Sequence, residues 1–175
     1  MNHIIEKGLP SDIDALEALY DELTGYLETH INYPGWKRGI YPDRETAETG
    51  VREGTLYVVR DGSRIAGTVI LRHVPEEAYS SANWGNELSY DDIIVIYTLA
   101  VHPDYLGKGV GREIMTFVID TARRTQMKAI RLDVYEKNVP AISLYRGFGF
   151  EYIGNVDLGY DGFGLDSFQL YQKVL

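Results

Sequence analysis

Three glycines at alternate positions form the part of this sequence whose residue types and spacing most directly suggest chemistry. Gly107, Gly109 and Gly111 follow an apolar, β-branched run, Ile93–Val101, which is typical of a buried strand. From Val110 onward the apolar residues recur at helical spacing. The start of a helix directs unpaired N–H groups at one point, and glycines lack the Cβ atoms that would prevent close approach. This order of elements therefore predicts a phosphate-binding turn.

Two common phosphate-binding motifs do not fit this turn. The nucleotide P-loop requires Gly-Lys-Ser/Thr, which the sequence does not contain, and the dinucleotide fingerprint requires a glycine where Arg112 stands. The stretch Leu106–Gly111 instead resembles the acyl-CoA signature [RQ]-x-x-G-x-[GA] of the GNAT superfamily of N-acetyltransferases. Leu106 departs from that pattern, which removes one side-chain contact and keeps the glycines. On the turn alone, an ordinary strand-to-helix connection is the alternative.

A second stretch, Leu132–Phe150, is similar to the other signature of the same family. It has an acidic residue near a strand end, followed by Asn138, Ala141, Leu144-Tyr145 and Gly149-Phe150. Because both signatures occur at the expected separation, the chain is identified as a member of this family by resemblance. The resemblance covers nearly the whole chain.

The resemblance implies acetyl-CoA as the cofactor and assigns residues to its parts. The backbone of Leu99, Ala100 and Val101 would pair with the pantetheine arm as an added strand would. Asn138 would form a hydrogen bond to the same arm. The pyrophosphate would be bound by backbone N–H groups, with two basic side chains adding charge, along Gly107, Lys108, Gly109, Val110, Gly111 and Arg112.

Acetyl transfer to an amine also requires a neutral amine, a polarised thioester carbonyl and a proton for the departing thiolate. The N–H group near Leu99 is the expected oxyanion donor. Tyr145 is the expected proton donor, since the pKa of tyrosine, about 10, is close to that of a thiol. Asp133 lies five residues before Asn138, where some relatives place a catalytic glutamate, and is the candidate base. A purely structural Asp133, a role for Glu136, or proton transfer through water remain alternatives.

Composition excludes several other classes of function. The 175 residues suggest a single domain, 1–175, and the absence of cysteine excludes disulfides, zinc–thiolate sites and thiol nucleophiles. The four histidines show no ligand spacing, so no metal is expected. A net charge of −9 without a long basic cluster argues against nucleic acid as a partner. No run has the length of a signal peptide or a membrane span, which favours a cytoplasmic protein.

Periodicity and turn residues predict an α/β (α+β) fold, with a mixed, largely antiparallel sheet flanked by helices on both faces, which is also the element order of the GNAT fold. A Ser11-x-x-acid pattern predicts one helix start, Asp43 and Gly54 bound a second helix, and Asp61-Gly62 predicts a tight hairpin turn with positive φ angles. The expected strands are Ile4–Lys7, Leu56–Arg60, Arg64–Leu71, Ile93–Val101, Ala129–Tyr135, Phe150–Val156 and Ser167–Val174. The expected helices follow Ser11, span Arg44–Glu53, begin at Val110 and span Val139–Arg146.

Two irregular segments remain, residues 30–42 and 73–92. The first contains several bulky rings and is expected to be either a lid over a site or a packed loop. The second is expected to be functional or mobile, and its Trp84 points either at the substrate or at the core. The bulky rings favour a closed acceptor site. We therefore expect an acetyl-CoA-dependent N-acetyltransferase that acts on a primary amine of a small molecule. A protein N-terminus or lysine as the acceptor is one alternative, and a non-catalytic acyl-CoA sensor is another. The resemblance also implies a possible homodimer.

Overall fold

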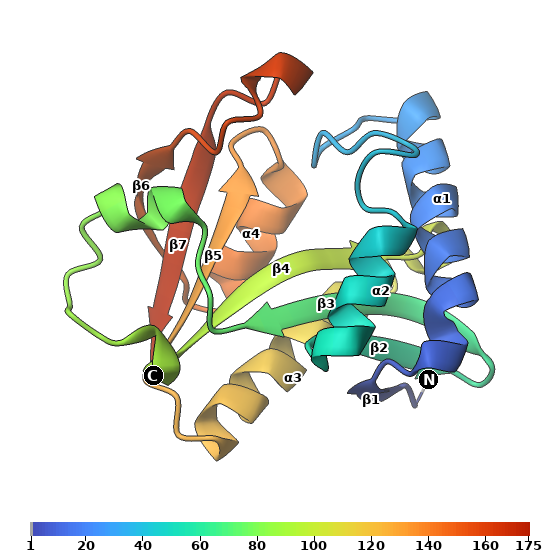
Figure 1. Cartoon of the computed structure of the whole chain (residues 1–175), viewed down its shortest axis with the longest axis horizontal. Coiled ribbons are helices and arrows are strands. Elements are labelled where there is room, and N and C mark those ends of the chain that lie inside the picture. The colour runs from blue at the N-terminus through green and yellow to red at the C-terminus, as the bar shows by residue number, and fades with distance from the viewer. Residues whose placement is uncertain (1) are drawn as a thin grey trace. The chain divides into compact units, whose positions relative to one another are not determined.

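The computed structural model describes residues 2–175 and is shown in Figure 1. The chain divides into two compact units. The first unit contains the described residues of Met1–Asn32, together with Trp36–Leu71 and Tyr97–Phe117. The second unit contains Tyr33–Gly35, Arg72–Ile96 and Val118–Leu175. Strand β4 and helix α3 contribute residues to both units. The single domain expected from the sequence stays a prediction.

The strands form a seven-stranded mixed sheet in the order β1-β2-β3-β4-β5-β7-β6. Strands β4 and β5 pair in parallel, whereas β1–β2, β2–β3, β5–β7 and β6–β7 pair antiparallel. The strands are β1 (Ile4–Lys7), β2 (Leu56–Asp61), β3 (Arg64–Arg72), β4 (Ile93–Val101), β5 (Ala129–Tyr135), β6 (Glu151–Val156) and β7 (Phe168–Val174). The α-helices are α1 (Ile13–Thr29), α2 (Arg44–Glu53), α3 (Val110–Arg124) and α4 (Val139–Gly147). The predicted fold class is confirmed.

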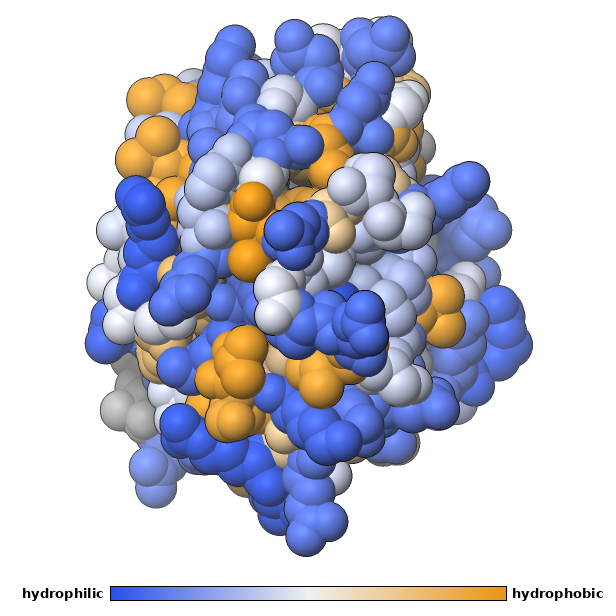
Figure 2. Space-filling model, turned by 90° about the vertical axis from the view of Figure 1, so that its left-hand side faces the viewer, coloured by the Kyte–Doolittle hydropathy of each residue, from blue (hydrophilic) through white to orange (hydrophobic). Residues whose placement is uncertain are grey.

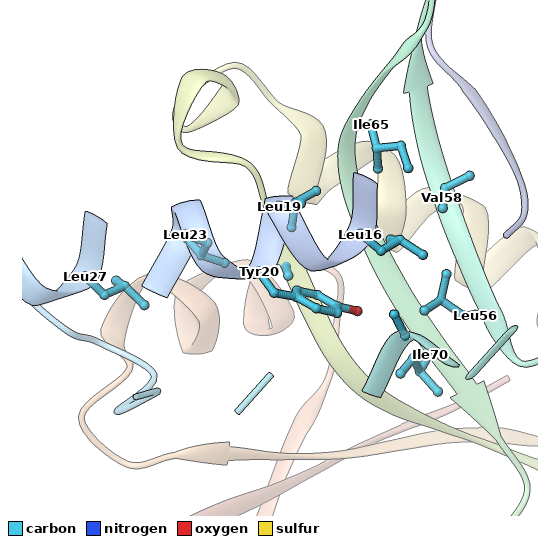
Figure 3. Packing of buried hydrophobic residues seen from close by; sticks show 11 residues of the cluster. Leu16, Leu19, Tyr20, Leu23, Leu27, Leu56, Val58, Ile65 and Ile70 are labelled. Carbon is cyan, nitrogen blue, oxygen red and sulfur yellow. The ribbon is translucent and has the colours of Figure 1, made fainter. Parts of the chain in front are cut away.

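In the first unit, one face of strands β2 and β3 forms a hydrophobic core with helices α1 and α2. Residues 56 and 70 are cross-strand partners, so Leu56 and Ile70 point to the same face, towards Leu16 and Tyr20 of α1. Figure 3 shows these side chains packed together with the other leucines of α1. Burial of this leucine-rich helix face is the main favourable contribution to the stability of this unit.

The opposite face of the same two strands is covered by the beginning of α3. The ring of Tyr57 lies 5.1 Å from the ring of Phe117, centroid to centroid. A Cβ atom added to Gly67 would lie 3.0 Å from both the Val110 side chain and a backbone carbonyl oxygen. Gly67 therefore allows α3 to approach the sheet closely. The helices of this unit thus cover both faces of its strands, as the sequence predicts.

Helix α2 ends as predicted at both termini. The Asp43 side chain accepts a hydrogen bond from the Thr46 N–H group, and Gly54 has the left-handed conformation that closes the last turn. The helix expected after Ser11 is α1, which begins at Ile13, but Ser11 does not cap it, because a short 3-10 turn occupies Pro10–Asp12. Asp12 accepts the Leu9 N–H bond there, at 2.8 Å, and its carboxylate also pairs with an arginine of β2.

The hairpin between β2 and β3 differs slightly from the expected turn. Asp61 is still part of β2 and pairs with Arg64, so the two turn residues are Gly62 and Ser63. Of these, only Gly62 has a positive φ angle, 59°. The turn therefore needs glycine at one position rather than at two.

In the first unit, residues 36–42 of the first irregular segment contact α1 and the core. Arg38 donates two hydrogen bonds to the Asp21 carboxylate of α1, both of 2.8 Å. Trp36 packs against the hydrophobic core, and its ring lies edge-on to the ring of Tyr41 at 5.9 Å. Trp36 is thus packed, whereas Ile40 and Tyr41 are 53 % and 40 % exposed, so the packed loop that the sequence allowed applies to only part of this stretch.

In the second unit, the 73–92 segment is fixed to the sheet by one buried arginine. Arg131 of β5 is only 2 % exposed, and its guanidinium lies 4.1 Å from the Trp84 ring. It donates hydrogen bonds of 2.8 to 2.9 Å to Asn86, Tyr90 and Gln172. All of these acceptors are neutral. Trp84 therefore belongs to a packed polar network in this unit.

No helix in the part of the chain from residue 2 to residue 175 is long and apolar enough to cross a membrane. Figure 2 shows hydrophilic side chains over most of the face that it displays, with hydrophobic side chains in separate small patches.

Candidate active site

The glycine turn of the first unit has the open backbone that the sequence predicts. Gly107 and Gly109 have φ angles of 73° and 88°, and Cβ atoms built on them would find no other atom within 4 Å. The first backbone bond of α3 runs from the Glu113 N–H group to the Gly109 carbonyl. The amides of Val110 and Gly111 precede that bond, so they lie at the positive end of the helix. This backbone can approach an anionic group closely.

The side chains around the turn place positive charge beside an aromatic ring. The Nζ atom of Lys108 lies 5.6 Å from the centre of the Tyr105 ring, and Arg64 lies against the same ring at 5.3 Å. The Tyr105 hydroxyl donates a 2.6 Å hydrogen bond to Asp61, whose carboxylate raises the pKa of that tyrosine. Leu106, where the signature has Arg or Gln, is 43 % exposed. As an apolar side chain, Leu106 has no hydrogen-bond donor to offer an anion at this turn.

The end of β4 contains an unusual backbone conformation just before the residues expected to bind the cofactor arm. The parallel ladder with β5 runs along Ile93–Ile96 of β4, and Tyr97–Val101 follows it. Thr98 has a φ angle of 44°, which β-branched residues rarely adopt. Ala100 is buried, while Leu99 and Val101 are partly exposed. The strand is thus irregular at the residue that precedes the expected oxyanion donor.

In the second unit, Asp133 has the properties of a base near neutral pH. Its Oδ2 atom accepts a 2.6 Å hydrogen bond from the Tyr79 hydroxyl. Burial raises the pKa of the carboxyl to about 6, the Tyr79 bond opposes this rise, and the charge of Glu76 adds to it. A carboxylate with such a pKa is deprotonated at pH 7 and is more basic than an ordinary aspartate.

Tyr145 of α4 is buried, with only 6 % of its surface exposed. Its ring lies 6.1 Å from that of Phe150, and its hydroxyl has no hydrogen-bond partner among residues 2–175. Burial, and then the charge of Asp133, raise the pKa of this hydroxyl. The group therefore retains its proton at neutral pH more firmly than the ordinary value used in the sequence argument implies.

Asn138 stands at the beginning of α4. Its side-chain oxygen accepts a 3.4 Å hydrogen bond from the Ala141 N–H group and so caps the helix. Its Nδ2 group has no partner within the described chain. The oxygen therefore has a structural role, and the NH₂ group remains available to a ligand. The roles assigned to Asn138, Tyr145 and Asp133 stay predictions.

Sequence reasoning missed two tyrosines, one of which contacts the candidate base Asp133 and the other Thr98, the residue before the candidate Leu99. Tyr79 bonds to Asp133, and the Tyr41 hydroxyl forms a hydrogen bond with the Thr98 hydroxyl. Both tyrosines come from the irregular segments, at sequence separations of 54 and 57 residues from their partners. The only available signal was the aromatic content of those segments, which does not identify a partner.

The model of the acetyltransferase (GNAT) family matches residues 16–150. The chain belongs to this family. Among curated proteins, the S-(2-succino)cysteine N-acetyltransferase of Bacillus subtilis is 27 % identical over 121 residues, which is 68 % of each chain. Matches to two other curated relatives, at 41 % and 39 % identity, extend over only 21 % and 22 % of those proteins.

Solved structures agree with the family at the level of the fold. A GNAT-family acetyltransferase from Streptococcus agalactiae superposes with a TM-score of 0.79 at 20 % identity, covering 99 % of this chain and 95 % of that one. A putative acetyltransferase from Salmonella typhimurium, solved with its cofactor acetyl-CoA, has a TM-score of 0.70 at 18 % identity and covers 100 % and 95 % of the chains. The predicted family and cofactor class, a GNAT acetyltransferase that uses acetyl-CoA, are confirmed.

Within residues 2–175, no group of three or more His, Asp and Glu side chains is arranged as a metal site.

Proposed function

We propose that this GNAT acetyltransferase transfers the acetyl group of acetyl-CoA directly to a primary amine of a small molecule. The observation that carries the proposal is the glycine turn. At Gly107 and Gly109 the left-handed backbone faces open space at the start of α3, which is the arrangement that a diphosphate requires. When bound, acetyl-CoA supplies the activated acetyl group as a thioester.

The turn would hold the pyrophosphate through the amides of Gly107 and residues 109–112. The Lys108 N–H group already donates to the Tyr105 carbonyl at 3.2 Å, so Lys108 would contribute only the charge of its side chain. The backbone of Leu99–Val101 would pair with the pantetheine arm, and the Leu99 N–H group would donate to the thioester oxygen. Thr98 supports this assignment, because a strand residue with φ of 44° turns the following amide away from its regular direction. Asn138 would contribute its NH₂ group to the same arm.

Asp133 would remove a proton from the acceptor ammonium group. Its raised pKa, about 6, leaves it ionised at pH 7 and brings it closer to the pKa of an amine than an ordinary aspartate is. The Tyr79 hydroxyl occupies Oδ2, so Oδ1 is the atom assigned to the amine. Tyr145 stays the proposed donor to the departing sulfur, although its raised pKa makes it a weaker acid than an ordinary tyrosine.

Two observations favour a small amine as the acceptor. A relative that covers 68 % of this chain is named for acetylation of an amino-acid derivative. The net charge of −9 also favours the approach of a cationic amine over that of an acidic molecule. The homodimer belongs to the same proposal and rests on the resemblance. The cytoplasmic location is also proposed, because no apolar run in this sequence has the length of a signal peptide or a membrane span.

A thiol-release assay tests the proposal. The enzyme with acetyl-CoA is offered polyamines, amino acids, aminoglycosides and short peptides, and we expect release that depends on one class of small amine. Release with peptides alone would identify a protein acetyltransferase. Binding of acetyl-CoA without release for any acceptor would identify a sensor.

The glycine turn itself is tested by Gly109→Glu, with Gly159→Glu as the matched control. Both glycines have positive φ angles, 88° and 83°, and both face open space. The backbone strain is therefore similar, whereas only Gly109→Glu places a carboxylate at the proposed pyrophosphate site. We expect Gly109→Glu alone to abolish binding of coenzyme A in a calorimetric titration. Unchanged affinity would refute this placement of the cofactor.

A further inference from the structure

Thr98 is held in a conformation that its own residue type disfavours. Within residues 2–175, the non-glycine residues with positive φ are Thr98 and Gln126. Gln126 follows α3, and its N–H group bonds back to the Arg123 carbonyl, so the end of the helix explains its conformation. Thr98 lies inside β4, where no helix end or turn explains a φ angle of 44°. A β-branched residue keeps such a backbone only when its surroundings impose it.

The side chain of Thr98 has a contact with the first irregular segment. The Tyr41 hydroxyl and the Thr98 hydroxyl form a hydrogen bond, 57 residues apart in sequence. This bond restrains the side-chain rotamer of Thr98 and so favours the backbone conformation that is compatible with that rotamer. Replacement of Tyr41 by phenylalanine would remove this hydrogen bond and keep the aromatic ring.

Tyr41 is itself well supported. Its N–H group bonds to the Lys37 carbonyl at 3.1 Å, and the two residues form an isolated β-bridge. Its ring lies against Trp36, which packs on the hydrophobic core of the first unit. Arg38, in the same segment, is tied to α1 through two bonds to Asp21. These contacts restrain the position of Tyr41 relative to β4.

The peptide group that follows Thr98 carries the Leu99 N–H group. Rotation about the backbone bonds of Thr98 directly changes the direction of that N–H group, whereas the glycine turn lies further along the chain. We propose that Tyr41 is a positioning residue for acetyl transfer, because its bond to Thr98 aims the Leu99 N–H group at the thioester oxygen. This inference rests on the proposed function, which assigns that oxygen to Leu99.

The test compares Tyr41→Phe, Thr98→Gly and the double variant, with Tyr26→Phe as a control. Tyr26 lies in the same unit, stacks on His30, and its hydroxyl has no hydrogen-bond partner in residues 2–175. We expect Tyr41→Phe to lower kcat at least about tenfold, since small errors in position at a reacting group are costly. The dissociation constant for coenzyme A should change less than about threefold, because the N–H groups at the start of α3 that receive the phosphates are untouched.

A second readout does not depend on activity. The backbone amide resonance of Leu99 in the ligand-free enzyme should shift or broaden in Tyr41→Phe and not in Tyr26→Phe. Glycine adopts positive φ without help, so Tyr41→Phe should have little further effect on kcat or on this resonance when residue 98 is glycine.

An unchanged kcat in Tyr41→Phe would overturn the inference, even with a shifted amide, because the bond would then be only structural. An equal loss of kcat in the Thr98→Gly background would also overturn it, since Tyr41 would then act elsewhere. Failure of the proposed function is visible separately, in the wild-type enzyme, as absence of coenzyme A binding or of thiol release. That result would remove the basis of this inference as well.

Discussion

Each of the two irregular segments places a tyrosine hydroxyl against another side chain, Tyr41 against Thr98 and Tyr79 against Asp133, but the two segments are held in different ways. Residues 36–42 are tied to α1 by Arg38, whose side chain is 48 % exposed and pairs with a carboxylate. The 73–92 segment is tied to β5 by Arg131, which is buried and bonds to neutral groups. An exposed ion pair is weak and screened by salt, whereas a buried arginine leaves unsatisfied partners when it is removed. The 73–92 segment, which bonds to Asp133, is therefore held more firmly than residues 36–42, which bond to Thr98.

The largest effect is expected from Arg131→Met. This change removes three hydrogen bonds and the contact with Trp84, and it leaves buried polar groups such as the Gln172 amide with fewer partners. We expect a loss of about 3 kcal/mol in the free energy of unfolding. Urea unfolding measures this loss, and hydrogen exchange should show faster exchange across residues 77–92. A loss below about 1 kcal/mol would mean that the network contributes little, and the contrast between the segments would disappear.

An intermediate effect is expected from Tyr79→Phe. Its hydroxyl lowers the pKa of Asp133 against the effect of burial, so its removal should raise that pKa above about 6. The acidic limb of the pH profile of kcat should move upward by up to about one pH unit, equivalent to about 1.4 kcal/mol. Asp133→Asn should remove the limb. A limb that stays in place in Tyr79→Phe would show that another group titrates there.

The free energy of unfolding should also depend on pH through the Asp133 carboxyl. The pKa of Asp133 is raised on folding, from 3.8 to about 6, so the folded protein binds more protons than the unfolded chain between these values. The contribution of Asp133 to stability therefore falls as the pH rises from about 4 to about 6. Asp133→Asn should flatten this part of the curve of unfolding free energy against pH. An unaltered curve would contradict the raised pKa.

The smallest effect is expected from Arg38→Gln. Loss of this exposed pair should cost less than about 1 kcal/mol, and the cost should shrink further at high salt. If Tyr41 acts as proposed, the loss in kcat, expressed as activation free energy, should exceed the loss in unfolding free energy, because the segment that holds Tyr41 is loosened. Urea unfolding and kinetics at low and high salt measure both quantities. A loss of unfolding free energy equal to that of Arg131→Met would contradict the difference between the two arginines.

Local signals in the sequence were sufficient for most elements of the fold. The spacing of Val110 and Ile114 predicted the buried face of α3, and both side chains are buried. Asp43 and Gly54 predicted the ends of α2 because capping depends on a few neighbouring residues. Ser11 failed because Asp12, one residue later, accepts the local N–H bond and also pairs with Arg60 of β2. A competing long-range partner leaves no local pattern.

The candidate site was predictable only where backbone conformation determines it. Gly107 and Gly109 were recognisable because positive φ angles in a turn favour glycine. Thr98 has a positive φ angle without glycine, so residue type gave no warning. Tyr79, the partner of Asp133, and Asn86 and Tyr90, two partners of Arg131, come from a segment without periodicity, 41 to 54 residues away. Side-chain networks of this kind follow from tertiary packing and could not be read from spacing.

The two ends of the Asn138 amide differ, because the oxygen caps α4 whereas the nitrogen, under the proposed function, would donate to the cofactor arm. Hydrolysis of this amide during ageing of the protein would produce an aspartate. The cap would survive, since aspartate caps helices as well as asparagine does, but a donor would be exchanged for a negative charge. Old preparations would then melt normally and bind acetyl-CoA poorly, so a thermal melt would be a misleading test of their quality.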